Sequence, residues 1–286
     1  VCSSDLPTTS LPQESRDRPF GASLQPSFTE RRPRSDWWSG DPCRRVGLAA
    51  ADDHAGSLWH AGRVSDAPAQ PGLYDAMSTL RAVRKLRPDP IPDDVLERVL
   101  QAACWAPTGG NTQPWRVIVA TDPDVKQGLA DIYAPEWAKY VGGFMKMMEG
   151  LPPEQLAPWE RVAAAGDYLA DHLHEAPAIL VFCANPKMMA ITDAKLDRVS
   201  VVGGGSIYPA VQNAMLACVA EGLGCTLTTL HCLREDEVKA LLGIPDGWAT
   251  AALVPIGYPV GKGHGPITRQ PPAQLAYRNT FGTTWS

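Results

Sequence analysis

The 286-residue chain has no run of lysine and arginine, no apolar stretch long enough to cross a bilayer and no basic-then-apolar leader. With a formal net charge of −5, it lacks the electrostatic footprint of a nucleic-acid-binding protein. The absent apolar stretch argues against a membrane span. The seven cysteines are scattered and several lie in apolar runs. This pattern predicts buried free thiols in a reducing, cytoplasmic setting.

Signatures of nucleotide, hydrolytic and metal chemistry are missing as well. No G-x-x-x-x-G-K-[ST] loop occurs, and the glycine run 203–205 lacks the dinucleotide pattern. Ser206 lacks the flanking residues of a nucleophile elbow. The histidines at 172 and 174, and the cysteine–histidine group at 225–232, miss the spacing of zinc ligands, so we expect no metal. A chain without an obvious acid, base or nucleophile is typical of a protein whose cofactor brings the chemistry.

Residues 1–72 differ in composition from the rest. They are rich in serine, proline, arginine, aspartate and glycine, and no apolar period persists in them. Such a segment buries too little surface to offset its chain entropy. We expect either a spurious read-through extension ahead of a natural start near Met77, or a genuine disordered tail. A peptide from residues 11–60 in the native protein would contradict the first interpretation.

From residue 73 to 286 the sequence predicts one folded domain. Helical spacing follows Pro90-Ile91-Pro92. Residues 124–175 are predicted to be a helical insert, interrupted at Gly142-Gly143 and at 150–153; it is either a lid over a pocket or simply part of the core and interface. Helices alternating with a few strands predict an α+β fold, a three-layer αβα sandwich around one small sheet. The predicted strands are 115–120, 178–183, 225–230 and 249–256, and a short amphipathic helix covers 234–242.

Two features predict a homodimer. The helix at 208–221 is apolar on almost every side, which indicates burial all round and sharing with a second subunit. The tail from Gly261 is rich in glycine, proline and glutamine, yet it retains apolar residues that predict docking. These are Leu275, Tyr277, Phe281 and Trp285.

The segment 106–115, Ala-Pro-Thr-Gly-Gly-Asn-Thr-Gln-Pro-Trp, lies between a predicted helix and a predicted strand. Two adjacent glycines allow a backbone to approach a flat ligand closely. Thr108, Asn111 and Gln113 add neutral donors and acceptors. The loop therefore suits a planar ring rich in heteroatoms.

A basic cluster precedes the first predicted amphipathic helix. Arg81 and Arg84 are three residues apart, so on a helical turn they would face one way and could grip a phosphate. The alternative is a solvated basic turn without a ligand.

Together, these segments resemble the nitroreductase-like flavoprotein family, from about Tyr74 to the C-terminus. Leu80-Arg81-Ala82-Val83-Arg84 lies where the family has Arg-Arg-Ser-x-Arg, and 106–115 lies at the family's flavin loop. Leu227-Thr228-Thr229 follows a Gly-Leu-Gly turn, at the family's contact near flavin N5. Arg269, ahead of Pro271, falls at the C-terminal phosphate arginine.

The resemblance implies an intertwined dimer with a mainly antiparallel sheet and FMN at the subunit interface. Arg81, Arg84 and Arg269 would hold the phosphate, although Leu80 and Ala82 depart from the family pattern. The loop would serve the flavin of the neighbouring subunit, and Thr228 and Thr229 would modulate N5; no catalytic residue is assigned. The implied cofactor contacts are Arg81, Arg84, Pro107, Thr108, Gly109, Asn111, Gln113, Leu227, Thr228, Thr229 and Arg269.

The resemblance also implies a function: ping-pong transfer from NAD(P)H, through FMN, to a flat electron-poor acceptor such as a nitroaromatic or quinone. One alternative is a specialised flavin oxidase or dehydrogenase, or a reductive dehalogenase. The dehalogenating branch of the family closes a Glu-Tyr-Lys trio over its amino-acid substrate. Glu136 and Tyr140 correspond loosely to the first two residues of the trio, but no lysine that would match the third precedes Ala176-Pro177. The other alternative is a non-catalytic flavin sensor or storage protein, for which Leu80 and Ala82 leave room.

Overall fold

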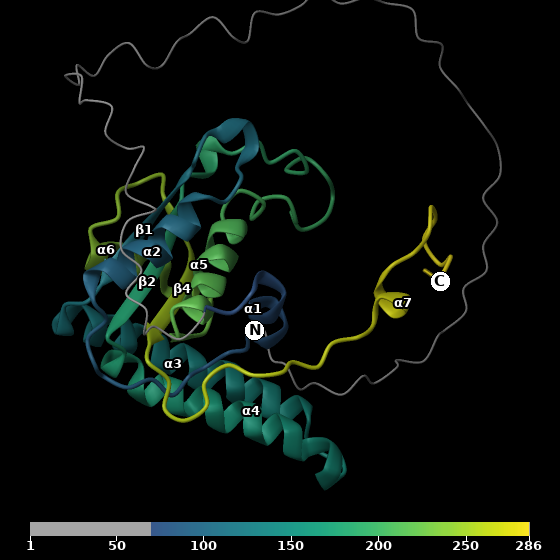
Figure 1. Cartoon of the computed structure of the whole chain (residues 1–286), viewed down its shortest axis with the longest axis horizontal. Coiled ribbons are helices and arrows are strands. Elements are labelled where there is room, and N and C mark those ends of the chain that lie inside the picture. The colour runs from purple at the N-terminus through teal and green to yellow at the C-terminus, as the bar shows by residue number, and fades with distance from the viewer. Residues whose placement is uncertain (1–69, 286) are drawn as a thin grey trace, which may run out of the picture. The chain divides into compact units, whose positions relative to one another are not determined.

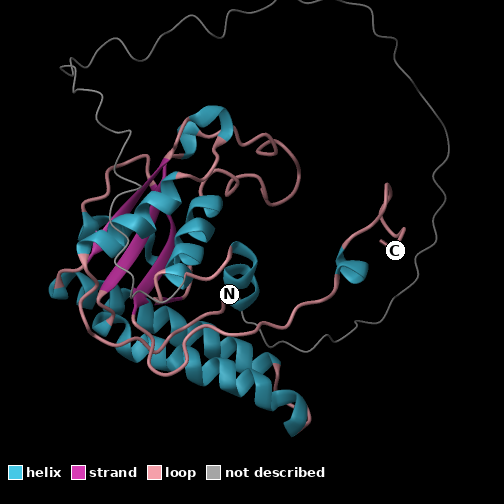
Figure 2. Cartoon of the chain, viewed as in Figure 1, coloured by secondary structure: helices cyan, strands magenta, loops and turns pink. Residues whose placement is uncertain are grey.

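A four-stranded sheet in the order β1-β2-β4-β3 organises residues 70–285, which the computed structural model describes (Figures 1 and 2). The extension predicted for residues 1–72 therefore lies almost wholly outside the described residues. The strands are β1 (Trp115–Ala120), β2 (Ala178–Ala184), β3 (Gly224–Cys225) and β4 (Ala249–Gly257). The helices are α1 (Leu73–Thr79), α2 (Asp93–Cys104), α3 (Pro123–Met147), α4 (Pro153–His172), α5 (Tyr208–Ala220), α6 (Glu235–Leu242) and α7 (Pro272–Leu275).

All three strand pairings are antiparallel, as the sequence predicted. The central strand β2 pairs with β1 and β4, and all seven of its residues are buried. A strand buried on both faces reads as a continuous apolar run, and this is what residues 178–184 show. The predicted strand at 225–230 is wrong in extent, because β3 ends at Cys225 and only Thr228 pairs again, with Leu253.

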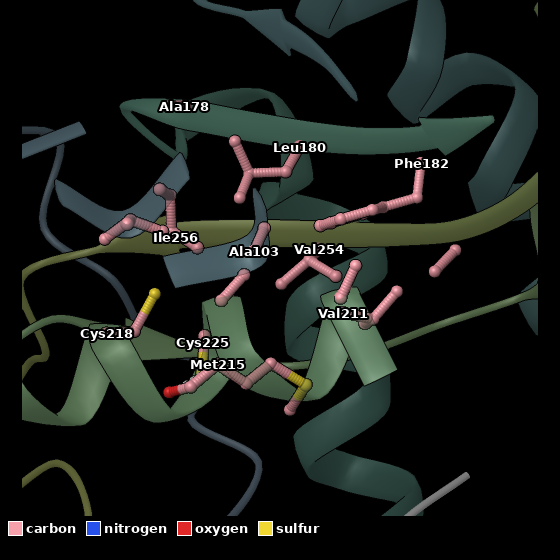
Figure 3. Close-up of a cluster of buried hydrophobic side chains, with 14 of the residues drawn as sticks. Ala103, Ala178, Leu180, Phe182, Val211, Met215, Cys218, Cys225, Val254 and Ile256 are labelled. Carbon is pink, nitrogen blue, oxygen red and sulfur yellow. Dashed lines mark hydrogen bonds between the residues drawn. The ribbon is translucent and has the colours of Figure 1, made fainter. Parts of the chain in front are cut away.

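Helices cover both faces of the sheet, which confirms the three-layer sandwich. On one face, α2 and α5 pack on Leu180 and Phe182 of β2, and Figure 3 shows Val211 of α5 directed at the strands. On the other face, α3, α4 and α6 pack on Ile179 and Val181. The side chains of β2 thus alternate between two cores, as the two-residue period of a strand requires.

The segment predicted as a lid insert is a helical hairpin of α3 and α4. Its first predicted interruption is wrong: α3 runs through Gly142-Gly143, and the break lies between Met147 and Pro153. Stacked rings of Tyr140 and Phe144, 6.4 Å apart, bracket the two glycines. Packing of this kind offsets the roughly 1 kcal/mol that a glycine costs a helix. No helix within residues 70–285 is long and apolar enough to span a bilayer.

The thiols divide into two groups. Cys183, Cys218 and Cys225 are buried, as predicted, whereas Cys104 and Cys232 are exposed, which contradicts the prediction for these two. Cys104 is the last residue of α2 and lies outside the buried stripe formed by Leu96, Val99 and Ala103. The remaining cysteines, Cys2 and Cys43, lie outside the described residues.

The C-terminal segment first pairs with the N-terminal part of the domain and then leaves it. Gly265 N donates to Thr79 O, and Ile267 N donates to Ser78 O. Further along, Phe281 is 93% exposed and Leu275 is 65% exposed. The predicted docking of this tail is thus not made within the described chain and stays a prediction about a second copy.

His231 makes the protein sensitive to acid. The ring is fully buried, its Nδ1 has no partner among the described residues, and burial lowers its pKa to about 4, against a smaller opposing effect of Glu235. The unfolded chain binds this proton near pH 6.5 and the folded protein only near pH 4. Stability should therefore fall by about 3 kcal/mol as the pH drops through this window.

Urea unfolding between pH 7.5 and pH 4 measures this loss. In His231→Gln the part of the slope due to this residue should vanish, even if the variant is less stable at every pH. An unchanged slope in the variant would assign the acid sensitivity to other groups.

Candidate functional site

A surface cavity of about 240 Å³ brings together three of the predicted cofactor contacts, Arg81, Leu227 and Arg269. They come from the segment after α1, from the chain after β3 and from the C-terminal segment. Pairing of residues 265–267 with residues 78–79 holds the first and last of these segments side by side. The cavity is lined by Met77, Leu80, Arg81, Ala82, Gln212, Met215, Thr226, Leu227, Ile267 and Arg269.

The lining of the cavity combines basic and apolar side chains. Two arginines line it and no aspartate or glutamate does. The Nε and Nη2 groups of Arg81 donate to Gly263 O at 3.0 and 2.8 Å, which fixes the guanidinium plane and leaves Nη1 for a ligand. Nη1 of Arg269 donates to the adjacent Thr268 O at 2.8 Å. Such a donor set suits an anion, because guanidinium groups bind phosphate through paired hydrogen bonds.

Two polar residues of this cavity, Gln212 and Thr226, were missed by the sequence reasoning. Gln212 is exposed and, with Asn213, forms the one amide pair on the largely apolar helix α5, which was a usable signal. Thr226 is 2% exposed and lines the cavity, just after β3. Both can donate to and accept from a ligand without adding charge.

Arg84 does not line this cavity, and the prediction that it shares a face with Arg81 is wrong. Residues 80–87 are not helical: Val83 N donates to Cys225 O, and Leu86 pairs with Pro259. The argument from a shared helical turn therefore does not apply to Arg81 and Arg84. The prolines at 88, 90 and 92 disfavour a helix there as well.

Arg84 instead lies near a buried tyrosine. Burial lowers its pKa, and Tyr133 opposes that shift. Burial also raises the pKa of Tyr133, whose hydroxyl is hydrogen-bonded to Thr228. Thr228 is therefore turned toward Tyr133, and its backbone pairs with Leu253 at 2.9 Å in both directions.

Thr229 lines a second cavity, of about 330 Å³, at the other end of α5. Its walls come from the end of β2, the start of β4 and the segment before α5, and none of the lining residues carries a charge. They are Ala184, Pro186, Met189, Ile191, Gly203, Gly204, Ile207, Tyr208, Thr229, Cys232, Ala249, Thr250 and Ala251. Residues 227–229 thus divide among three surroundings, because the chain leaves the extended conformation at Thr229 (φ −126°, ψ 4°) and turns into a 3-10 helix at Leu230.

The loop 107–113 lines neither cavity, and most of it is exposed. It contains a short 3-10 turn at Gly109–Asn111. Gly109 N donates to Ser206 Oγ at 3.3 Å, which ties the loop to the segment that precedes α5. Within one chain the loop does not meet the arginine cavity. The polar residues predicted for one flavin site therefore form two separate groups.

Glu136 and Tyr140 lie on α3. Glu136 is buried, and its Oε1 is 2.7 Å from Lys139 Nζ, so its charge is already paired. Tyr140 is 39% exposed and contacts the rings of Trp137 and Phe144. The structure thus gives Glu136 a cationic partner, from its own helix.

Fold and site together define an α+β protein with a surface cavity for an anionic, partly apolar ligand. The family model that matches is that of the nitroreductase family, over residues 79–258. The chain belongs to the nitroreductase family.

The sequence identity to individual relatives is below 30%. The chain is 27% identical over 192 residues to iodotyrosine deiodinase 1 of Rattus norvegicus, covering 65% of this chain and 62% of that protein. It is 28% identical over 188 residues to NADH dehydrogenase of Thermus thermophilus, covering 64% and 85%. A structure of oxidized iodotyrosine deiodinase bound to FMN and 3-iodo-L-tyrosine superposes with a TM-score of 0.54, 22% identity and coverage of 73% and 99%. That likeness supports the fold.

Proposed function

We propose that the chain is an FMN-dependent oxidoreductase that takes reducing equivalents from NAD(P)H and passes them to a flat, electron-poor acceptor. The observation that carries this proposal is the cavity that Arg81 and Arg269 both line. Two arginines line the cavity and no carboxylate does, so the lining suits a phosphate. Met215 and Leu227 add apolar surface, and Thr226 adds a buried hydroxyl. The donor set fits FMN, which joins a phosphate to a polar chain and a flat ring.

The protein binds, orients and shields; FMN, when bound, supplies the electron transfer. Arg81 is held by Gly263, so it meets a phosphate with little loss of side-chain freedom. Gln212 and Thr226 are placed to hydrogen-bond the polar part of the ligand. Arg84 does not line the cavity; its side chain lies near Tyr133, which in turn lies near Thr228.

We infer that the site is completed by a second copy of the chain. The loop 107–113 carries neutral donors and acceptors but lines neither cavity of its own chain. Exposed apolar side chains on α5 and in the tail, such as Tyr208 and Phe281, remain to be covered. A homodimer accounts for both features, with the loop of one copy facing the flavin of the other.

The acceptor is proposed to be an uncharged aromatic such as a nitroaromatic or quinone. The relatives include a protein named iodotyrosine deiodinase, which makes reductive dehalogenation the second candidate. Against it, Glu136 is already paired with Lys139, so it would have to leave that partner to bind a substrate ammonium group. A flavin sensor without turnover is the candidate of another class.

Absorbance spectroscopy and anaerobic stopped-flow test the proposal. The purified protein should be yellow, or become so with FMN, and the visible flavin absorbance should be lost within seconds of mixing with NADH or NADPH. Nitrofurazone or a quinone should restore it, whereas 3-iodotyrosine should not. Restoration by iodotyrosine would favour dehalogenation, and a flavin stable to both nicotinamides would favour the sensor. A preparation that FMN cannot turn yellow would overturn the proposal.

A further inference from the structure

The loop 107–113 is held in a conformation that its residues do not favour on their own. Gly110, Asn111 and Gln113 have φ angles of +59°, +53° and +45°. Glycine adopts this left-handed region freely, but for other residues it costs about 1–2 kcal/mol. Two non-glycine residues in that region, on an exposed loop, persist only if the surrounding contacts impose it.

Both backbone groups of Gln113 are hydrogen-bonded. Its N–H donates to Thr108 Oγ1 at 3.1 Å, and its carbonyl accepts from Arg116 Nη1 at 3.1 Å. The same Nη1 donates to Trp115 O at 2.7 Å. One guanidinium therefore spans the junction where the loop becomes strand β1, and it joins a loop carbonyl to a strand carbonyl.

Arg116 is itself fixed at both ends. Its backbone lies in β1, opposite Cys183 of the buried strand β2. Its guanidinium carbon is 5.5 Å from the centroid of the Trp248 ring, which packs against the core beneath α3 and α6. A planar guanidinium can stack on an aromatic ring while its edge donates to carbonyls, a combination that an ammonium group does not offer.

We propose that Arg116 is a positioning residue for flavin binding: it locks Gln113 in the left-handed conformation and so presents the loop 107–113 to the cofactor. This inference rests on the proposed function. In this inference, the conformation of the loop is determined by a side chain that lies outside the loop, on strand β1. Because the loop is already ordered before the cofactor binds, binding does not have to order it, and the entropic cost of binding is lower.

The test compares Arg116→Met with Arg116→Lys, using Arg87→Met as the matched control. Arg87 is also an exposed arginine over an aromatic ring, 5.3 Å from Tyr258, and it pairs with Asp89 rather than with a loop carbonyl. FMN affinity is measured by fluorescence quenching on apoprotein. We expect about a tenfold loss for Arg116→Met, a loss of no more than about threefold for Arg116→Lys, and no change for Arg87→Met.

Two measurements on apoprotein separate positioning from general stability. Amide hydrogen exchange in residues 108–114 should accelerate in Arg116→Met and not in Arg87→Met, while the urea midpoint stays within the range of a surface substitution. Unchanged FMN affinity, or unchanged exchange in the loop, overturns the inference and leaves the proposed function intact. Failure of the wild-type apoprotein to bind FMN overturns both.

Discussion

Replacing Arg81 by alanine should weaken FMN binding by about 10- to 100-fold. A hydrogen bond from a charged group contributes about 1.5–3 kcal/mol when its partner depends on it, and 1.4 kcal/mol is a factor of ten. Arg81 belongs at the upper end of the range, because Gly263 already orients its guanidinium. Arg269→Ala should cost less, about tenfold, because its exposed guanidinium is hydrogen-bonded, within residues 70–285, only to the adjacent Thr268. Titration of apoprotein with FMN measures both.

The controls separate contact from charge. Arg81→Lys keeps the positive charge but loses the fork that joins Gly263 to a phosphate, so it should recover only part of the affinity. Lys262→Ala removes one charge from the same exposed segment without touching the cavity, so it should leave the affinity within about twofold. If Arg269→Ala binds FMN as the wild type does, the phosphate assignment of Arg269 is wrong. Equal losses in Lys262→Ala and Arg269→Ala would mean that net charge, not the cavity, sets the affinity.

The fold was predictable because its main signals are local. Residues 178–184 are apolar without interruption, and only a strand covered on both faces satisfies that pattern. Gly243 closes α6 in the left-handed conformation, as a glycine after an amphipathic run predicts. Gly142-Gly143 led to a wrong prediction of a helix break, because the contacts that decide this position are not local. Phe144 of α3 stacks on Tyr140 and also contacts the ring of Trp159 of α4, 5.1 Å away, and spacing within one helix does not show this second contact.

The site was harder to predict, because spacing means different things in a helix and in an extended segment. The helical spacing of Arg81 and Arg84 counts only if residues 81–84 are helical, and they are not: Val83 N donates to Cys225 O instead. That pairing joins segments more than a hundred residues apart and has no local signal. Gln212 was within reach of sequence reasoning, as a polar residue on an apolar helix. Thr226 was not, since its role depends on the position at which β3 ends.

The α3–α4 hairpin offers the second large effect, through two glycines of opposite character. Gly166 of α4 lies directly against Trp137 of α3, and a Cβ at this position would overlap the indole ring. Trp137 Nε1 also donates to Asp167 Oδ1 at 2.7 Å, which fixes the ring in place. Gly142 of α3, by contrast, has no atom within 4 Å of the position that its Cβ would take.

Alanine should therefore act in opposite directions at the two sites. Gly142→Ala gains helix propensity at no packing cost and should stabilise the protein by about 0.5–1 kcal/mol. Gly166→Ala gains the same propensity, but it must displace a buried indole and its hydrogen bond, so it should destabilise by about 2 kcal/mol net. Urea unfolding of the two variants beside the wild type measures the difference. Since propensity alone predicts the same sign at both positions, stabilisation by Gly166→Ala would show that the hairpin yields at Trp137. The close approach of α3 and α4 at Gly166 would then not be what holds the α3–α4 hairpin together.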